Sequence, residues 1–549
     1  MQIRSDILRI YQTLHTWVGI LAGILLFIGF YAGALTMFKE EIAAWSSPPQ
    51  TILPQVKLEQ MDKLLSEARA QHPELSKGFS LHLASDKHSP LSWYASGSER
   101  QWGLGDELWH ASLSNQGELI SHKEPKSQLA RLIDELHRTG GIPGDMGHEQ
   151  LGAYFMGVAG ILYFLALVSG VIFLLPTLVK TLFALRRKKG PNRFWLDSHN
   201  LLGITALPFH IIISLTVVVF VFHDQLYGAL GQFVYGDKPM FNREAPKGEV
   251  RSLSTLPPVT ELVARAENFA PGYQALSLTY MGMDTPAPMV RMAMYNEEAL
   301  MRGPIGDFLY MNPYTLEVGN STFTPGEEGV WGRMVSVFFG LHFGSYGGYP
   351  GRWLYFFLGM SGAMLFYSGN LLWLEKRRSK QRKGEPIPEQ PKRVRILGAA
   401  TVGICLGSML GVALAMLLGK WGYAHVENIN HLYLWSYYAS FLIALAYAFW
   451  RGAARAAVTL QALSALVCLA MPLTSILALL APVLEFGHRR PQAPGRWISP
   501  HSVLPPSLPL ARSKLLNERP RARLTVSGPC RKNSLLLRCK PAFSLKLLV

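Results

Sequence analysis

Four histidines occur at matched positions in two similar stretches of the chain. His15 lies in YQTLHTWVGI and His199 in WLDSHNLLGI, each four residues before a glycine. His137 and His342 each follow a leucine in a short segment that ends in glycines. Haem iron is commonly held by axial imidazoles, and helix bundles build such sites from facing helices. The spacing therefore predicts two axial ligand pairs, His15 with His199 and His137 with His342.

A fifth histidine, His210, offers an alternative for one of these pairs. It lies 11 residues after His199 in the same apolar run, which is about 16 Å further along a continuous helix and about 20° around it. Two histidines on one helix face can serve two stacked haems, so His210 is the rival of His137 or His342 at the outer site. Its structural alternative is a hydrogen bond between membrane helices.

Two arginines, Arg138 and Arg352, are candidates to bind haem propionates, because a guanidinium binds a carboxylate bidentately. No CxxCH string is present for covalent attachment, so a haem would be held by ligation and packing alone. The chain also has no dinucleotide-binding glycine motif after a predicted strand and no Walker A string. We therefore expect its electrons to come from a quinol or from a separate cytoplasmic reductase.

Membrane helices must position these histidines. Hydrophobic residues make up 49% of the 549 positions and charged residues only 16%, below the ~25% typical of soluble domains. A span needs about 20 mainly apolar residues. The first such stretch follows two arginines as a signal peptide would, but it is too long and lacks a small-residue cleavage site. It is expected to be retained. The seven stretches lie near 15–38, 151–178, 200–222, 352–374, 396–419, 432–450 and 454–482.

Basic residues in short loops predict the orientation. The runs at 186–193 and 377–395 are strongly basic, so both loops and the N-terminus are expected in the cytoplasm. The long segments between spans then lie in the periplasm, and the protein is a multi-pass protein of a bacterial inner membrane, in contact with lipid. Most of the net charge of +16 belongs to the tail at 483–549, which is predicted to be disordered. The charge therefore does not indicate nucleic-acid binding.

The two outer segments follow the same plan. Amphipathic helices at 64–74 and 261–271 are predicted by their 3.6-residue period. Alternating strands follow each helix, and a turn-like string follows the third strand. Each segment then ends in a histidine-bearing helix and a membrane helix. Two such units usually pack about a pseudo-two-fold axis, which would bring the equivalent histidines together. The predicted strands are FSLHL, LSWYA and ELWHASL, then ALSLTY, MVRMAMY and DFLYMN.

The predicted fold class is a mainly α membrane protein. A duplicated helix–(α+β)–helix unit forms a four-helix haem-binding bundle, and about three C-terminal transmembrane helices follow it. The predicted limits are 1–39 for the first membrane helix, 40–150 for the first outer domain, 151–178 for the second helix, 179–198 for a cytoplasmic loop, 199–222 for the third helix, 223–350 for the second outer domain, 351–376 for the fourth helix, 377–395 for a cytoplasmic linker, 396–482 for the last three helices and 483–549 for the tail.

These features resemble the PepSY-associated transmembrane family, in which PepSY-like α+β domains alternate with membrane helices. The resemblance covers roughly residues 5–376. It rests on LHTWVGI and SHNLLGITALPFH at the span starts and on the Leu-His pairs at 136–137 and 341–342. Some members are similar to di-haem ferric-siderophore reductases. The resemblance implies two haem b groups, with the four paired histidines as matching ligands and His210 matching a subset.

The resemblance also implies an activity, the reduction of periplasmic ferric siderophore to release Fe(II) for iron uptake. Two alternatives stay open. In the first, the PepSY-like domains bind or inhibit peptidases and the helices are an anchor, which leaves the matched histidines unexplained. In the second, the duplicated units form a transporter, although no span has paired carboxylates or a broken-helix signature. The resemblance does not explain the three C-terminal helices.

Overall fold

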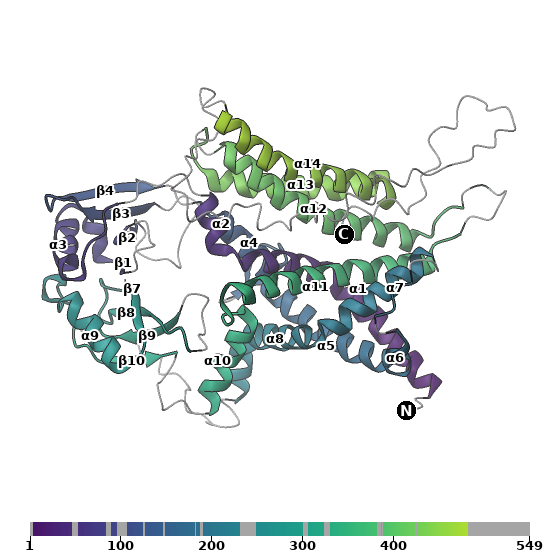
Figure 1. Ribbon diagram of the computed structural model, residues 1–549, viewed down its shortest axis with the longest axis horizontal. Helices are drawn as coiled ribbons and strands as arrows, with labels where there is room; N and C mark the ends of the chain where they lie inside the picture. Colours follow the sequence, from purple (N-terminus) through teal and green to yellow (C-terminus); the bar gives the residue numbers. More distant parts are fainter. Residues whose placement is uncertain are drawn as a thin grey trace.

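The computed structural model describes most of the chain up to residue 480, and the predicted tail at 483–549 lies outside the described residues. Figure 1 shows a β-sheet with its helices at one end and a bundle of long helices at the other. The described residues are 4–46, 53–83, 89–95, 107–124, 127–146, 149–181, 183–186, 190–230, 249–299, 306–322, 330–380, 386, 388–422 and 425–480.

Seven helices in this described part are long and apolar enough to cross a membrane, and each overlaps one of the predicted stretches. Their backbone hydrogen bonds are internal, as a lipid environment requires. Several helices extend beyond their apolar stretches, so the first begins about ten residues earlier than predicted. The helices are α1 (Ser5–Thr36), α5 (Leu151–Leu174), α8 (Leu207–Leu230), α11 (Gly348–Arg377), α12 (Lys392–Gly422), α13 (Ile429–Arg451) and α14 (Ala453–Leu480).

The third predicted span is broken into two helices. A separate helix, α7 (Pro191–Thr205), precedes α8, and Ala206 between them has non-helical dihedral angles. Pro208 explains the break, because it lacks a backbone N–H and its ring would clash with the carbonyl of Ile204, four residues earlier, in a continuous helix. The prediction that His199 and His210 share one continuous helix is therefore wrong. His199 lies on α7 and His210 on α8, so the expectation that no span is a broken helix is also wrong.

We call α1 to α5 the first unit and α7 to α11 the second unit. In the bundle, α1 packs against both α5 and α11. Small residues allow close crossings: a Cβ added to Gly359 would lie 3.0 Å from Ala34 Cβ, and one added to Gly362 would lie 2.3 Å from the Phe30 ring. The last three helices, α12 to α14, pack on one another and lie along one side of the bundle (Figure 1).

The outer strands of both units join in one eight-stranded sheet of order β10-β9-β8-β7-β1-β2-β3-β4. The first strands of the two units, β1 and β7, pair antiparallel at its centre, with Ser80 opposite Thr279. The two predicted outer domains thus share a single sheet, and each unit adds a fourth strand that was not predicted. The strands are β1 (Gly78–His82), β2 (Leu91–Tyr94), β3 (Leu108–Leu113), β4 (Leu119–Glu124), β7 (Gln274–Met281), β8 (Met289–Tyr295), β9 (Asp307–Met311) and β10 (Val318–Ser321).

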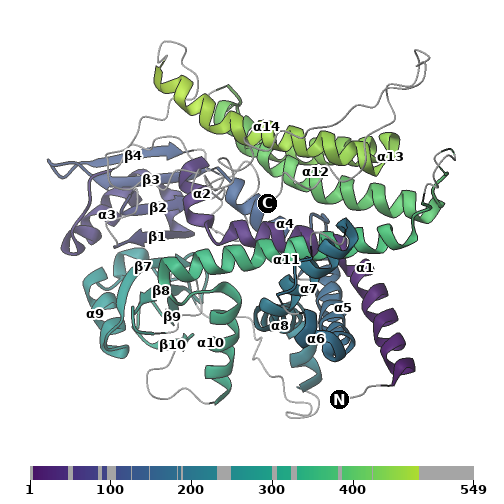
Figure 2. The same ribbon diagram turned by 45° about the vertical axis from the view of Figure 1, so that its right-hand side comes forward.

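The predicted amphipathic helices, α3 (Met61–Gln71) and α9 (Val259–Phe269), cover one face of this sheet. Both lie on the side away from the membrane helices (Figures 1 and 2). Leu64, Leu81 and Met292 are fully buried between these helices and the sheet, and burying such a side chain contributes about 1.5–3 kcal/mol each. Short 3-10 turns flank the helices at Leu58–Gln60, Pro73–Ser76 and Leu253–Thr255.

Two shorter helices follow the strands and carry the remaining paired histidines: α4 (Leu129–Thr139) with His137, and α10 (Val330–Phe343) with His342. Helix α4 ends at Gly140, whose φ of +63° suits glycine and whose N–H bonds to Leu136 O at 3.0 Å. The remaining elements are α2 (Lys39–Ser46), β5 (Asp145–Met146), β6 (Glu149–Gln150), a 3-10 turn at Leu175–Thr177 and α6 (Leu178–Thr181).

Candidate functional site

The structure brings the four matched histidines together as two pairs. His15 on α1 faces His199 on α7, with ring centres 6.3 Å apart and ring planes at 77°. His137 on α4 faces His342 on α10, with ring centres 6.2 Å apart and planes at 39°. Each pair takes one residue from the first unit and one from the second. We call them the inner pair and the outer pair, because the outer pair is on the helices that follow the sheet.

The hydrogen bonds of the inner pair define the proton position on each ring. His15 Nδ1 is 2.8 Å from the carbonyl oxygen of Ala166, and a carbonyl only accepts, so Nδ1 carries the hydrogen. His199 Nδ1 is 3.1 Å from Ser368 Oγ. Ser368 donates its own hydroxyl hydrogen to Leu365 O, so its oxygen accepts from His199. In both neutral rings the lone pair is therefore on Nε2.

The outer pair has the same arrangement. His137 Nδ1 donates to the carbonyl oxygen of Gly29 at 2.8 Å. His342 Nδ1 is 2.8 Å from Thr216 Oγ1. The Thr216 hydroxyl donates to Ile212 O at 2.8 Å, so Oγ1 accepts the hydrogen of His342 Nδ1. Both outer rings thus also keep their lone pair on Nε2.

This pattern fits metal-bound histidine, whose second ring nitrogen donates to a carbonyl or another acceptor that fixes the ring. If each Nε2 bound a shared metal at about 2 Å, the two ring centres would lie roughly 6 Å apart, and the observed separations are 6.3 and 6.2 Å. Two rings are too few for structural zinc, which takes four ligands, and the described residues contain no group of three or more His, Cys, Asp or Glu that could hold a metal. Two axial imidazoles are the ligand set of a haem iron. The residues present therefore fit a haem at each pair.

Glycines on neighbouring helices make room for three of the rings. A Cβ added to Gly170 on α5 would lie 2.9 Å from the His15 ring, and one on Gly33 of α1 would lie 2.6 Å from His137 Nδ1. A Cβ on Gly369 of α11 would lie 3.2 Å from the His199 ring. Only glycine allows these imidazoles to lie so close to a helix backbone.

His210 lies apart from both pairs. Its side chain is 0% exposed and packs against the rings of Phe30, Phe209 and Tyr163, with ring centres 5.5–6.0 Å away. Neither ring nitrogen has a hydrogen-bond partner within the described part of the chain. The structure therefore does not bring His210 to another histidine, and its role as a ligand stays a prediction.

The two arginines expected to bind propionates lie in different surroundings. Arg138 on α4 is exposed and lies 4.0 Å from Glu135. Arg352 on α11 donates twice to Met37 O, at 2.9 and 2.6 Å, and once to Glu41 at 2.6 Å. Arg352 thus ties α11 to the end of α1 and to α2. A propionate would have to share these donors, so the role of Arg352 at a haem also stays a prediction.

The sheet face opposite α3 and α9 is turned toward the membrane helices and is polar. Residues in register form a row across seven strands, from β4 to β9. On the first unit this row includes the stacked rings of His110 and His122, with centres 5.6 Å apart. On the second unit, the Arg291 guanidinium lies 5.2 Å from the centre of the Phe308 ring. The row is His122, His110, Ser92, Ser80, Thr279, Arg291 and Tyr310.

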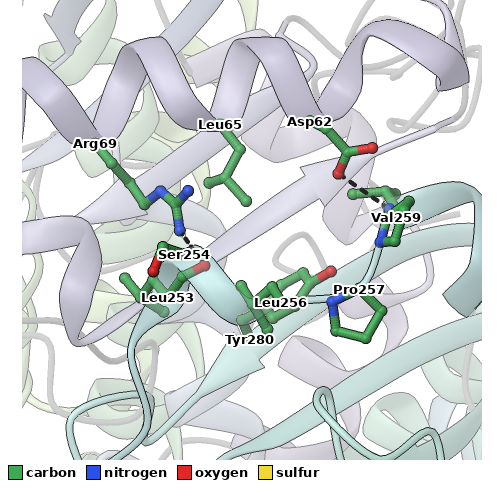
Figure 3. Close-up of a pocket in the computed structure, with 10 residues that line it drawn as sticks. Asp62, Leu65, Arg69, Leu253, Ser254, Leu256, Pro257, Val259 and Tyr280 are labelled. Carbon is green, nitrogen blue, oxygen red and sulfur yellow. Dashed lines mark hydrogen bonds between the residues drawn. The ribbon is translucent and has the colours of Figure 1, made fainter.

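A pocket of about 270 Å³ lies where α3 meets the segment before α9 (Figure 3). Its polar groups already join the two units: Arg69 donates to Leu253 O at 2.6 Å, and Asp62 Oδ1 accepts from the N–H of Val259 at 3.0 Å. These bonds make the pocket part of the seam between the units. We assign no ligand to it.

Sequence reasoning missed the residues that fix the rings. Thr216 and Ser368 look like ordinary hydroxyl residues of membrane helices, and only the fold shows that they face His342 and His199. One signal was available: a Ser-Gly pair occurs in both VSGVIF and YSGNLL. The glycine of each pair lies against a ring of the inner pair.

Comparison with known proteins shows which family the chain belongs to. Residues 12–376 match the PepSY-associated TM region family. A curated protein of Pseudomonas aeruginosa, described as uncharacterized, is 27% identical over 254 residues. That match covers 42% of this chain and 59% of the relative, so the chain spans less than two thirds of the relative's length. Because the family match covers most of the chain, including both histidine pairs, this protein belongs to the PepSY-associated TM family.

Proposed function

We propose that the protein is a di-haem oxidoreductase that passes electrons across a bacterial inner membrane. The observation that carries this proposal is the state of the four paired histidines, each with Nδ1 donating and the lone pair on Nε2. Partly buried imidazoles that donate from Nδ1 in this way have the ring orientation that metal-binding histidines usually have. When bound, haem b supplies one-electron redox chemistry.

The residues of this chain bind and orient the groups that carry the electron. The inner pair holds one haem between α1 and α7, and the outer pair holds the second between α4 and α10. The Nδ1 hydrogen bonds fix the orientation of the four rings, so each Nε2 would be free to bind a haem iron without the ring having to turn. The seven apolar helices exclude water from the path between the two sites. We place the inner pair on the cytoplasmic side, following the basic loops at 186–193 and 377–395.

The proposed acceptor is a periplasmic ferric siderophore, and the proposed donor is quinol or a cytoplasmic reductase. The acceptor follows the resemblance stated above. It is supported by the polar sheet face, which carries Arg291, Tyr310 and the His110–His122 stack. The sheet lies at the same end of the molecule as α10, one of the two helices that carry the outer pair (Figures 1 and 2). Cationic and hydrogen-bonding groups of this kind suit an anionic, oxygen-rich chelate.

The visible spectrum of the full-length protein in detergent, purified from haem-supplied cells, tests the proposal. We expect a Soret band, α and β bands after dithionite, and close to two haems per chain. A protein without these bands would remove the electron-transfer function. Addition of a ferric siderophore to the reduced protein should reoxidise the haems and deliver Fe(II) to a ferrous chelator.

Substitution of single ligands tests the pairing. His15→Ala and His342→Ala should each lose one haem, and the double variant should lose both. His210→Ala should keep two haems, because His210 lies apart from both pairs. If His210→Ala loses a haem while His137→Ala retains two, the outer assignment is wrong.

A further inference from the structure

The three C-terminal helices lie beyond the family match, which ends at residue 376. One of them, α13, contacts α4, the short helix that carries His137. The contacts include hydrogen bonds at both ends of α4, made by polar residues of α13. Polar groups inside membrane helices usually serve a partner helix.

At the start of α4, two residues of α13 supply hydrogen-bonding partners. The N–H of Gln128, the N-cap residue, donates to Asn430 Oδ1 at 2.8 Å. Ser127 Oγ lies 3.0 Å from the Tyr433 hydroxyl oxygen and 2.7 Å from Ser46 Oγ on α2. Gln128 makes no side-chain cap of its own. Asn430 therefore provides an acceptor that the helix start needs.

At the end of α4, the same helix makes a third contact. The Tyr438 hydroxyl donates to Gly141 O at 3.3 Å, directly after the Gly140 cap. The neighbouring Tyr437 ring is 1% exposed, and its hydroxyl oxygen would lie 3.8 Å from a Cβ on Gly141. Helix α13 thus holds α4 at both ends.

The position of His137 tolerates little movement of α4. Its Nδ1 bonds to Gly29 O, and Gly33 has no room for even one methyl group beside the ring. A helix of 11 residues has little stability by itself, so its place depends on what it packs against. Helix α4 packs mainly on α1, and also on α2, α5 and α13. The counterpart helix α10 packs on α8, which also supplies Thr216, the acceptor for His342.

We propose that α13 positions the outer haem site, with Asn430, Tyr433 and Tyr438 as positioning residues that set the depth and tilt of α4. The proposal rests on the proposed function, because the ligand being positioned is His137. It assigns a role to helices that the family match does not cover. The bundle core provides the outer site, and the added helices hold one of its two ligand helices in place.

Two readouts on the full-length protein test this role. The first is hydrogen exchange of the α4 amides, which needs no haem. The second is the EPR signal and midpoint potential of the outer haem, identified as the haem that His137→Ala loses. In the combined variant Asn430→Ala with Tyr438→Phe, we expect faster exchange in α4 and a changed signal for that haem alone. We also expect the combined variant to bind the outer haem on the order of 10-fold more weakly than the wild type does.

A matched control is available on the same helix. Tyr447 bonds to Thr459 on α14, at 3.2 Å between the oxygens, so Tyr447→Phe removes a hydroxyl of α13 without touching α4. It should leave exchange in α4 and both haem signals unchanged. The single variant Tyr433→Phe should give a smaller effect than the combined variant, since Ser127 keeps its bond to Ser46.

The outcomes separate the two proposals. A wild-type protein that binds no haem would overturn both. The wild type could bind two haems while the combined variant shows an unchanged outer-haem signal and unchanged hydrogen exchange in α4. That result would overturn the positioning role alone. Equal changes in both haems would also contradict it, because α13 contacts the helix of the outer pair and a general loss of structure would affect both.

Discussion

The two units orient their paired histidines with different hydrogen-bond acceptors. In the first unit both histidines donate to backbone carbonyls, His15 to Ala166 O and His137 to Gly29 O. In the second unit His342 donates to the Thr216 hydroxyl, and His199 lies within hydrogen-bonding reach of both the Ser368 hydroxyl and the backbone carbonyl of Leu365. A carbonyl acceptor is fixed by the helix path, whereas a hydroxyl acceptor is fixed by residue identity.

This difference determines which substitutions each unit tolerates. A backbone acceptor cannot be removed by changing a side chain, but the ring must then lie against the helix surface, where only glycine fits. A hydroxyl acceptor can be deleted by one substitution while the helix stays in place. Both units are therefore expected to be sensitive at the glycines that lie against their rings, Gly33, Gly170 and Gly369. The second unit is expected to be sensitive also at Thr216, the hydroxyl acceptor of His342.

The largest effect is expected from Gly33→Ala in the first unit. The new methyl group would lie 2.6 Å from His137 Nδ1, and the ring cannot yield without breaking its bond to Gly29 O. The purified variant should contain about one haem, and the inner haem should keep its spectrum. Gly19→Ala is the matched control on α1, because nothing lies within 4 Å of a Cβ there. If purified Gly33→Ala contained two haems, glycine would not be required beside the His137 ring, and the expected sensitivity of the first unit at glycines would be wrong.

A smaller effect is expected from Thr216→Val in the second unit. Valine keeps the shape of threonine but removes the acceptor for His342 Nδ1. Loss of a hydrogen-bond partner behind a metal ligand typically weakens binding by about 10–100-fold, and we expect the outer haem to be bound more weakly by about that factor. Thr216→Ser should restore the binding. Thr205→Val is the control, since Thr205 is exposed and its hydroxyl bonds within its own helix, to Leu201 O. Equal haem retention in Thr216→Val and Thr205→Val would show that the hydroxyl does not matter.

The smallest effect concerns the outer sheet, where the first unit has a charged network at Glu74. Burial raises the pKa of Glu74, but hydrogen bonds from its own backbone, Trp93 and His72 outweigh it and hold the pKa below its usual value. A lowered pKa stabilises the fold above the unfolded value of about 4.3 and ceases to do so as pH falls through the folded value.

Thermal unfolding of Glu74→Gln checks this network. At pH 7 the variant should be less stable by under about 1 kcal/mol, because Glu74 is partly exposed. The difference should shrink as the pH is lowered below about 4. A difference that stays constant down to pH 3 would mean that the carboxylate charge is not the stabilising element.

The sequence by itself determined the helices and strands and which histidines correspond. Apolar runs of about 20 residues can only be helices in lipid, and period and turn residues located α3, α9 and most strands of the sheet. The break before His210 was missed, although Pro208 is the local cause. A proline breaks some membrane helices and only kinks others, because neighbouring helices can satisfy the freed carbonyl.

Only the tertiary structure decided what surrounds each histidine. Three kinds of contact join residues more than 100 positions apart in the chain. They are the pairing of β1 with β7, the hydrogen bonds of His199 and His342 to hydroxyls, and the close approach of glycines to the histidine rings. Such contacts depend on how helices cross, and no local pattern encodes a crossing. The same reason explains why α13 looked unrelated to the site: its polar residues meet α4 only when some 300 residues of chain have folded between them.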